Sequence, residues 1–594
     1  MFEMQLMEQA NIESAETCPA FEMEVEWLPY GGGGDSNGGA SSGGRSGVGE
    51  KGRGEWKVDI RIPEREMFKY KKVANRTKPV ATTLPEEYRI KRYPIEDPLA
   101  DLPELPVDPP DFTPGKRYTQ ERYEAMDIDP DEFLWPAEEK LTHVTILVNE
   151  DALAWDESEK GSFHEANFPG VRMATIEHTP YSERNFQVPP GIMREVLEYL
   201  KTKIASGVYE PSNSSYRSAW FCVPKRNGKI RLVHNLQPLN RVTIRDSATP
   251  PYTEQLAESF GGRACYATLD LFVAFDQRKL DERSRDLTTF NTPLSTFRLT
   301  AIPMGWTNSF QVMQGDVSFI LCDEIPEFTI PYADDVPIRG PATRYIQADG
   351  TYETIPGNSG IRRFVWEHLQ AVNRILHRMK KYGGTFSAKK LVLCAPRAIV
   401  LGHLCTAEGR APDEERVQRI KDWPPCKTVT EVRAFLGTLG WVRHFIEGFA
   451  MKARPLVALT RKGVAFEWGA EEDAAMEELK HSIIGSPALR AIDYDSGREV
   501  VLAVDSSIIG VGFILLQVGA DGKRYPNRFG SIAWHGREVN YSQAKLELYG
   551  LMRALKAVKL YVVGVTNFTV EVDAKYIKGM LNNPDIQPNA TINR

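Results

Sequence analysis

The sequence lacks several features that would assign it to a common class of protein. Its seven cysteines include no C-x-x-C pair, which excludes a zinc knuckle of the usual spacing. Scattered cysteines in an odd number fit a reduced intracellular protein. No apolar run approaches the roughly 20 residues of a membrane span, and the acidic start has no signal-peptide pattern. These absences predict a protein of the cytosol or the nucleus.

An excess of positive charge is also missing. The formal net charge is -7 with 26% charged residues, so any surface that binds nucleic acid must be local. The chain of 594 residues is long enough for about four domains, and each could bury a core of its own. Its hydrophobic share of 42% is ordinary for a globular protein.

Two segments near the start have a strongly biased composition. The run "GGGGDSNGGASSGGRSGVGEKGRG" (31–54) could suggest a phosphate-binding loop, but it lacks a flanking strand and helix and a Gly-Lys-Ser/Thr ending. It is typical of a flexible linker. The run 94–114 is rich in proline and acid, which disfavours a packed core. We therefore expect residues 1–115 to be largely disordered and residues 116–185 to form an N-terminal extension.

Ordered elements of both kinds follow. Apolar spacing and flanking Pro and Gly residues predict helices at 189–207, 364–383, 431–449 and 542–562. Short apolar runs predict a hairpin at 218–236, strands at 266–275, 328–338 and 568–574, and a strand pair at 498–518. The pattern predicts a mixed α/β (α+β) protein with at least two catalytic units.

Three carboxylates accompany two of these strands. Asp270 lies in "TLDLFVAFDQ", and Asp334 and Asp335 lie in "PYADDVPI". If the strands are neighbours, the three groups converge and can hold two divalent cations about 3.5–4 Å apart. Taken alone, an Asp-Asp pair after a strand is more often a solvated turn. The presence of a third carboxylate, Asp270, in a second predicted strand favours a metal site.

Four motifs occur in a characteristic order and spacing: "LDLFVAFDQ", "AIPMGWTNSFQVMQ", "PYADD" and "VLGHLCTAEG". With their flanks they resemble the reverse transcriptases of gypsy-like long-terminal-repeat retrotransposons, in wording closest to the fungal elements. The resemblance covers roughly residue 178 to the C-terminus. It implies a right-hand polymerase of fingers and palm (186–405), followed by a thumb and connection segment (406–490).

The resemblance also implies roles for single residues. Asp270 would bind both metals with the backbone carbonyl of Leu271, Asp334 would take the matching position, and Asp335 would support them. Phe275, five residues after Asp270, would lie under the sugar and exclude a ribose 2′-hydroxyl. Simple core packing is the alternative interpretation of Phe275.

Other matching positions would bind nucleotide or primer. The basic hairpin tip would bind the triphosphate, Met304 and Gly305 would line the nucleotide pocket, and Leu401 and Gly402 would hold the primer end with His403. The three basic residues of the hairpin are Lys225, Arg226 and Arg231; a solvated hairpin is the alternative. Two positions depart from the family's pattern: Asn235 stands where the family usually has an aspartate, and "FDQ" stands where it prefers a tyrosine-histidine pair. The long loop 339–363 has no assigned role.

The final segment, 491–594, resembles the ribonuclease H domain that follows reverse transcriptase in the same elements. Asp505, Glu547 and Asp573 match its first three acids on a strand, a helix and a strand, and imply a second two-metal site. Asp585 is the only acidic residue after Asp573, and the Asn and Pro residues around it suggest a loop. We therefore expect a truncated domain with little or no ribonuclease H activity. We see neither an aspartic-protease motif nor an integrase segment, which suggests a piece of a polyprotein.

Taken together, the sequence predicts an RNA-directed DNA polymerase that copies RNA and DNA templates with two Mg²⁺ ions per active site, Mn²⁺ being a possible substitute. Its partners would be an RNA template, a DNA primer, RNA–DNA hybrid and deoxynucleoside triphosphates, with no membrane and a possible homodimer. We expect it in the cytoplasm, in a retrotransposon particle, or in the nucleus. The alternative is a non-catalytic nucleic-acid-binding relic. An RNA-templated RNA polymerase is disfavoured by Phe275 and by the ribonuclease H segment.

Overall fold

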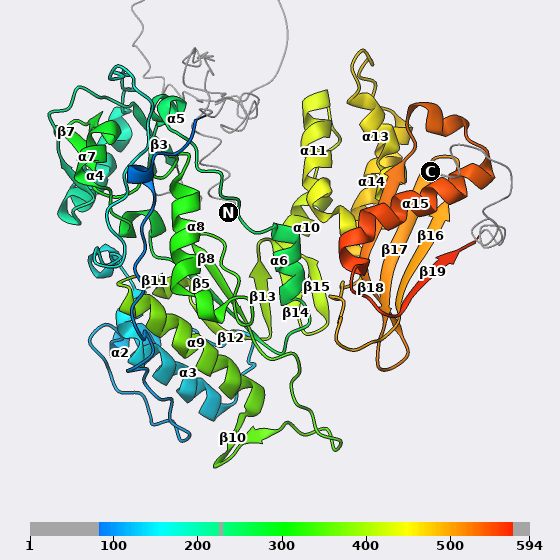
Figure 1. The fold of residues 1–594 in the computed structure, drawn as a ribbon, viewed down its shortest axis with the longest axis horizontal. Coiled ribbons are helices and arrows are strands. Elements are labelled where there is room, and N and C mark those ends of the chain that lie inside the picture. Colours follow the sequence, from blue (N-terminus) through cyan, green and yellow to red (C-terminus); the bar gives the residue numbers. More distant parts are fainter. Residues whose placement is uncertain (1–81, 225–229, 574–594) are drawn as a thin grey trace, which may run out of the picture.

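The computed structural model describes residues 82–224 and 230–573. They form two lobes, with the predicted fingers and palm in one lobe and helices and a large sheet of the C-terminal half in the other (Figure 1). The linker at 31–54, the basic residues Lys225 and Arg226 and everything after Asp573 lie outside the described residues. No described helix is both long enough and apolar enough to cross a membrane.

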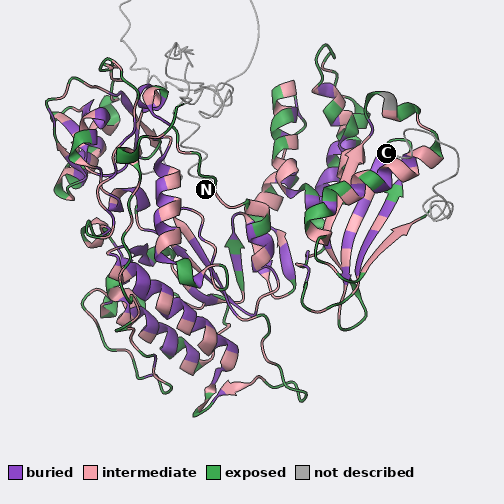
Figure 2. Cartoon of the chain, viewed as in Figure 1, coloured by how far each residue is buried: buried purple, intermediate pink, exposed green. Residues whose placement is uncertain are grey.

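A small antiparallel sheet forms the centre of the first lobe. Its strands lie in the order β12-β5-β8, with β5 (Tyr266–Asp270) between β8 (Asp335–Arg339) and β12 (Val392–Ala395). Helices α8 (Ser309–Ile320) and α9 (Arg363–Lys381) pack with this sheet, and α9 buries residues at helical spacing (Figure 2). The remaining elements of this region are α5 (Gln237–Val242), α6 (Thr253–Phe260), η6 (Ala274–Gln277), α7 (Glu282–Arg285) and β11 (Phe386–Ser387).

The fingers have a separate core. The apolar face of the predicted helix, through Val196 and Leu200, packs there with Trp220 and Phe290. The basic hairpin is antiparallel, as expected from its two apolar runs. The elements are α4 (Met193–Ala205), β2 (Tyr209–Pro211), β3 (Trp220–Pro224), β4 (Ile230–His234), β6 (Phe290–Asn291) and β7 (Thr296–Leu299).

The structure differs from the expected disorder over residues 82–115. This stretch has little regular structure, yet Leu105 belongs to the main core. Arg92 Nε lies 2.6 Å from Asp316 Oδ1, and the other oxygen of that fully buried carboxylate binds Arg278 Nε at 2.8 Å. Proline prevents helices and central strands but leaves side chains of an extended chain free to pack, and composition alone does not reveal this.

The loop 339–363, to which the sequence assigned no role, packs on the N-terminal extension. Its hairpin, β9 (Thr354–Ile355) and β10 (Asn358–Arg362), ends in Arg362, whose Nη2 lies 2.6 Å from Glu138 Oε2 on α3 (Pro136–Val148). Both side chains are buried, and four aromatic rings surround the guanidinium. The two unassigned segments thus support each other. The other elements of the extension are α2 (Gln120–Glu124) and β1 (Leu153–Ala154).

Three further units follow along the chain. A sheet β13-β14-β15 leads to a helical unit, and the last unit has a four-stranded sheet in the order β18-β17-β16-β19 with α15 on one face (Figure 1). Strands β16 and β19 are parallel, and the other pairs are antiparallel. The elements are β13 (Arg397–Val400), β14 (His403–Thr406), β15 (Gly409–Pro412), α10 (Glu414–Lys421), α11 (Val429–Val442), α12 (Phe449–Lys452), α13 (Arg454–Leu459), α14 (Ala470–Ile484), β16 (Val500–Ser506), β17 (Gly510–Val518), β18 (Arg524–Ala533), α15 (Gln543–Val562) and β19 (Phe568–Val572).

Two strands correct the sequence interpretation. The strand expected at 328–338 begins only at Asp335, because residues 332–335 form a tight turn, closed by hydrogen bonds between Tyr332 and Asp335 in both directions. Strand β18 was not predicted. Its run "RYPNRFGSIA" contains a proline and several polar residues and shows no regular apolar alternation.

Candidate active sites

The first site is formed where β5 ends and β8 begins. Asp270 and Asp335 are directly paired residues of the two antiparallel strands. The backbone N–H of Leu271 donates to the carbonyl oxygen of Asp334 at 2.9 Å, which holds the turn against the end of β5. The register of one strand pair therefore brings together the three carboxylates that the sequence singled out.

A glutamine on α8 holds this turn in place. Gln314 Oε1 accepts from the N–H of Ala333 at 2.8 Å, and its Nε2 donates to the carbonyl of Pro331 at 3.0 Å. Ala333 is fully buried and has φ +53°, a left-handed conformation that costs a non-glycine residue of order 1–2 kcal/mol. Sequence reasoning missed Gln314, although it lies within the quoted motif "NSFQVMQ".

Burial and mutual repulsion make the cluster unfavourable for negative charge. Burial raises the pKa of Asp335 to about 6, and the neighbouring Asp334 and Asp270 add to the rise. Burial also raises the pKa of Asp270, with a further contribution from Asp334, while Lys390 acts in the opposite direction. The site therefore favours either protons or cations.

Lys390, which the sequence analysis did not select, supplies one positive charge. Its Nζ lies 3.1 Å from Asp270 Oδ2, and the lysine side chain is 60% exposed. It lies two residues before the start of β12, which is an edge strand of the central sheet. A mobile, exposed ammonium can leave the carboxylate when another cation arrives.

The donor set fits a hard divalent cation. Carboxylate and backbone carbonyl oxygens are the ligands that Mg²⁺ prefers, and the pKa of Asp335 is raised mainly by burial and further by the two neighbouring carboxylates. Across residues 82–224 and 230–573, the three acids do not form a group whose ligand atoms all lie within 4.8 Å. Binding would draw them together, with Lys390 displaced from Asp270.

The residues expected to contact the nucleotide lie in different environments. Phe275 is 6% exposed and belongs to the main core, so core packing contributes to its role at this position. Met304 is 39% exposed. Gly305 has φ +96°, and its carbonyl accepts from Asn240 Nδ2 at 2.9 Å. Arg231 lies on β4 opposite Val223.

Side-chain contacts hold the loop that carries Phe275 in position. Asp276 Oδ2 lies 2.7 Å from the ammonium of Lys203, a largely buried side chain of α4. Gln277 is fully buried and exchanges two hydrogen bonds with the backbone of Thr385. These contacts connect the fingers, the loop and the segment before Lys390, and sequence reasoning did not identify them.

The turn expected to hold the primer end is strained and tightly enclosed. Leu401 has φ +50° and Gly402 has φ +80°. A Cβ on Gly402 would lie 2.7 Å from Arg416 Nη2. His403 is buried, and burial with nearby Arg410 and Arg416 lowers its pKa to about 3, so the imidazole is neutral.

A second group of acids lies on the C-terminal sheet. Asp505 is in β16 and Asp573 directly follows β19, its parallel neighbour. Glu547 projects from α15, and its pKa is raised by burial and by the other two acids. Asp505 and Asp573 line a cavity of about 350 Å³ together with Glu447 and Met451. The fold thus gathers the three acids selected from the sequence.

Comparison with known families defines the class of both units. Residues 223–405 match the family described as reverse transcriptase (RNA-dependent DNA polymerase). Residues 468–570 match the RNase H-like domain found in reverse transcriptase. The chain therefore contains a region of the reverse transcriptase family and, after it, a region of the RNase H-like family.

Individual relatives are polyproteins of long-terminal-repeat retrotransposons, in agreement with the gypsy-like resemblance. The chain is 24% identical over 412 residues to the Transposon Tf2-3 polyprotein of Schizosaccharomyces pombe, covering 69% of this chain and 29% of the relative. It is 26% identical over 415 residues to the Retrovirus-related Pol polyprotein from transposon 412 of Drosophila melanogaster, covering 68% and 31%. The chain thus matches less than a third of the length of these relatives.

Solved structures support the same fold. The foamy viral protease-reverse transcriptase in complex with dsDNA gives a TM-score of 0.67 at 19% identity, covering 81% of this chain and 94% of that one. The same protein in complex with RNA/DNA hybrid gives 0.60 at 18% identity, covering 77% and 59%. A right-hand polymerase followed by an RNase H-like domain is the shared architecture.

Proposed function

We propose that this chain is the polymerase region of a retrotransposon protein that copies RNA and DNA templates into DNA. The observation that carries the proposal is the pairing of Asp270 with Asp335, and of Leu271 with Asp334, at the end of the central sheet. Two Mg²⁺ ions held there would activate a primer 3′-hydroxyl and stabilise the leaving pyrophosphate. Reverse transcriptases generally depend on divalent cations.

The surrounding residues would position the reactants. Gln314 fixes the turn that presents Asp334, and Phe275 would lie beneath the sugar of a deoxynucleotide. Lys390 neutralises part of the acidic charge and can approach the triphosphate when the cations bind. Such positioning supplies a large share of the rate enhancement in nucleotidyl transfer.

The proposed ligands are a template-primer duplex, RNA–DNA hybrid and deoxynucleoside triphosphates. Support comes from the structural relatives, which were solved with dsDNA and with RNA/DNA hybrid. Asp505, Glu547 and Asp573 would bind the cations of a ribonuclease H site. A cytoplasmic particle or the nucleus is the proposed location, in keeping with the retrotransposon relatives.

Primer extension on a poly-ribonucleotide template with Mg²⁺ tests the polymerase. Asp334→Asn removes a metal ligand and no phosphate contact, so extension should be lost while hybrid affinity stays within a few-fold. Asp495→Asn, at an exposed turn that belongs to neither acidic group, is the control and should extend normally. Retention of more than about a tenth of the extension rate by Asp334→Asn would contradict the two-metal assignment.

A non-catalytic relic is the second candidate. It predicts binding of hybrid without extension by the unaltered chain, so the same assay separates the two functions.

A further inference from the structure

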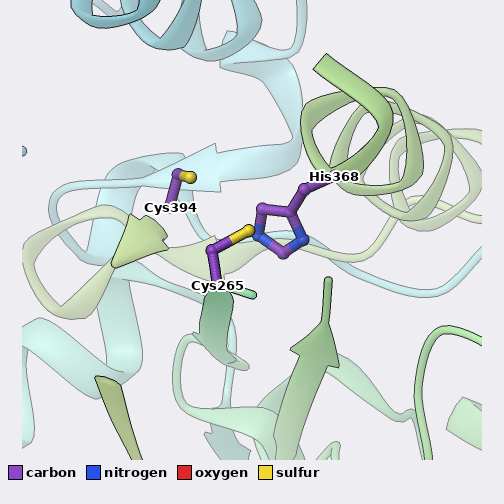
Figure 3. A group of neighbouring side chains, drawn as sticks. All are labelled: Cys265, His368 and Cys394. Carbon is purple, nitrogen blue, oxygen red and sulfur yellow. The ribbon is translucent and has the colours of Figure 1, made fainter. Parts of the chain in front are cut away.

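A buried group of soft ligands lies away from the acidic sites. Cys265 directly precedes β5, Cys394 lies on β12 and His368 on α9, and the three side chains gather at one place (Figure 3). Their ligand atoms all lie within 4.8 Å of one another, and none of the three residues is more than 1% exposed. No other such group is present in the part of the chain that the structure describes.

The group of two cysteines and a histidine lies at the end of the central sheet opposite the acidic cluster. Cys265 directly precedes β5, whose other end is Asp270, so the sulfur lies about 17 Å along the strand from the catalytic carboxylate. Cys394 is on the neighbouring strand β12, and His368 is on α9. A Cβ on Gly340 would lie 2.7 Å from Cys265 Sγ, so the backbone confines this sulfur on one side.

The imidazole has an unused nitrogen. His368 Nε2 lies 2.8 Å from the carbonyl oxygen of Leu393, whereas Nδ1 is buried with no hydrogen-bond partner. Burial lowers the pKa of His368 to about 4, so the ring is neutral and carries one lone pair for a ligand. A buried nitrogen without a partner is costly in an apolar core, and a metal bound at Nδ1 would remove that cost while Nε2–H keeps its bond to the carbonyl of Leu393.

We propose that Cys265, Cys394 and His368 bind one Zn²⁺ ion. Two thiolates and an imidazole are ligands that Zn²⁺ prefers, and with two thiolates the complex is electrically neutral, which suits a buried position. At about 2.3 Å per Zn–S bond, tetrahedral thiolates lie about 3.8 Å apart, so the sulfurs need move by no more than about 1 Å. The carbonyl of Leu393 or a water would supply a fourth ligand.

Binding follows a defined proton balance. The two thiols lose two protons as the two Zn–S bonds form, with no change in oxidation state. Burial raises the pKa of the Cys394 thiol well above its usual value. Because binding releases thiol protons, the apparent affinity for the ion should fall as the pH falls. The ion would connect the strand of Asp270 to β12 and α9, a structural role separate from the proposed polymerase chemistry.

The direct test uses the whole chain, purified under reducing conditions, treated with a chelator and then supplied with excess Mg²⁺ to occupy the oxygen sites. Co²⁺ is titrated as a probe, and thiolate-to-cobalt charge-transfer absorption is recorded. We expect absorption that saturates at one equivalent and is displaced by one equivalent of Zn²⁺. Zinc should also raise the Tm by several degrees. Absence of thiolate absorption in the unaltered chain would overturn the proposal, whether or not any variant folds.

Matched variants identify the ligands. Cys265→Ser and Cys394→Ser should each abolish the absorption and the rise in Tm, and His368→Gln should weaken binding at least tenfold. Cys426→Ser is the control, because Cys426 is also a buried free cysteine but lies in the helical unit. Metal binding that survives in both Cys265→Ser and Cys394→Ser would contradict the assignment. So would the formation of a disulfide between the two cysteines of the unaltered chain without any uptake of metal.

Discussion

Replacing Gln314 by alanine tests how much the acidic turn depends on a single side chain. The change removes the acceptor for the N–H of Ala333 and the donor to the carbonyl of Pro331. Because Ala333 is buried, its N–H would be left without a partner at a cost of about 1–3 kcal/mol, and the lost donor bond adds about 1 kcal/mol.

A local cost of about 2–4 kcal/mol lowers the population of the competent turn about 30- to 900-fold, since each 1.36 kcal/mol is a factor of ten. We therefore expect single-nucleotide extension at saturating nucleotide to fall at least about 30-fold, with duplex affinity unchanged. Gln314→Glu keeps the acceptor for Ala333 and should retain more activity than alanine. An alanine variant within threefold of the parent rate would show that β5 and β8 hold the carboxylates without help from α8.

Four further predictions address selectivity, pH and stability. Phe275→Val should raise the efficiency of ribonucleotide use relative to deoxynucleotide use, because the steric clash with the 2′-hydroxyl disappears; an unchanged ratio in steady-state kinetics would place the selectivity elsewhere. Since the pKa of Asp335 is raised to about 6, protonation below that pH competes with the cation, and the Mg²⁺ concentration for half-maximal extension should rise as pH falls through 6. For the same reason Asp335→Asn should stabilise the metal-free chain above pH 6 and have no such effect near pH 4, which thermal denaturation across pH can check. Arg410→Met leaves the buried carboxylate of Glu258 without its cationic partner and should destabilise the chain by about 3–5 kcal/mol at neutral pH. Burial already raises the pKa of Glu258, so the loss should become smaller as the pH is lowered; a loss that does not change with pH in thermal denaturation would rule out this electrostatic cause.

Much of the local structure could be predicted from the sequence because it depends on neighbouring residues. The spacing of apolar residues located α4, α9 and α15, and the two apolar runs around "KRNGK" defined the antiparallel hairpin. The order and spacing of the motifs also predicted which acids to assign to each proposed site. Strand β18 and the packed segment 82–115 were missed, since their composition resembles that of loops while their stability comes from distant parts of the chain.

Only the tertiary structure decided which distant side chains share a site. The packing of α8 brings Gln314 to the turn that it holds. The strand order β12-β5-β8 brings Lys390 to Asp270. The same holds for Cys265, His368 and Cys394, whose spacing along the chain matches no metal motif. Sequence patterns report contacts within one helix or hairpin, whereas these groups meet because the hydrophobic core fixes the relative positions of several elements.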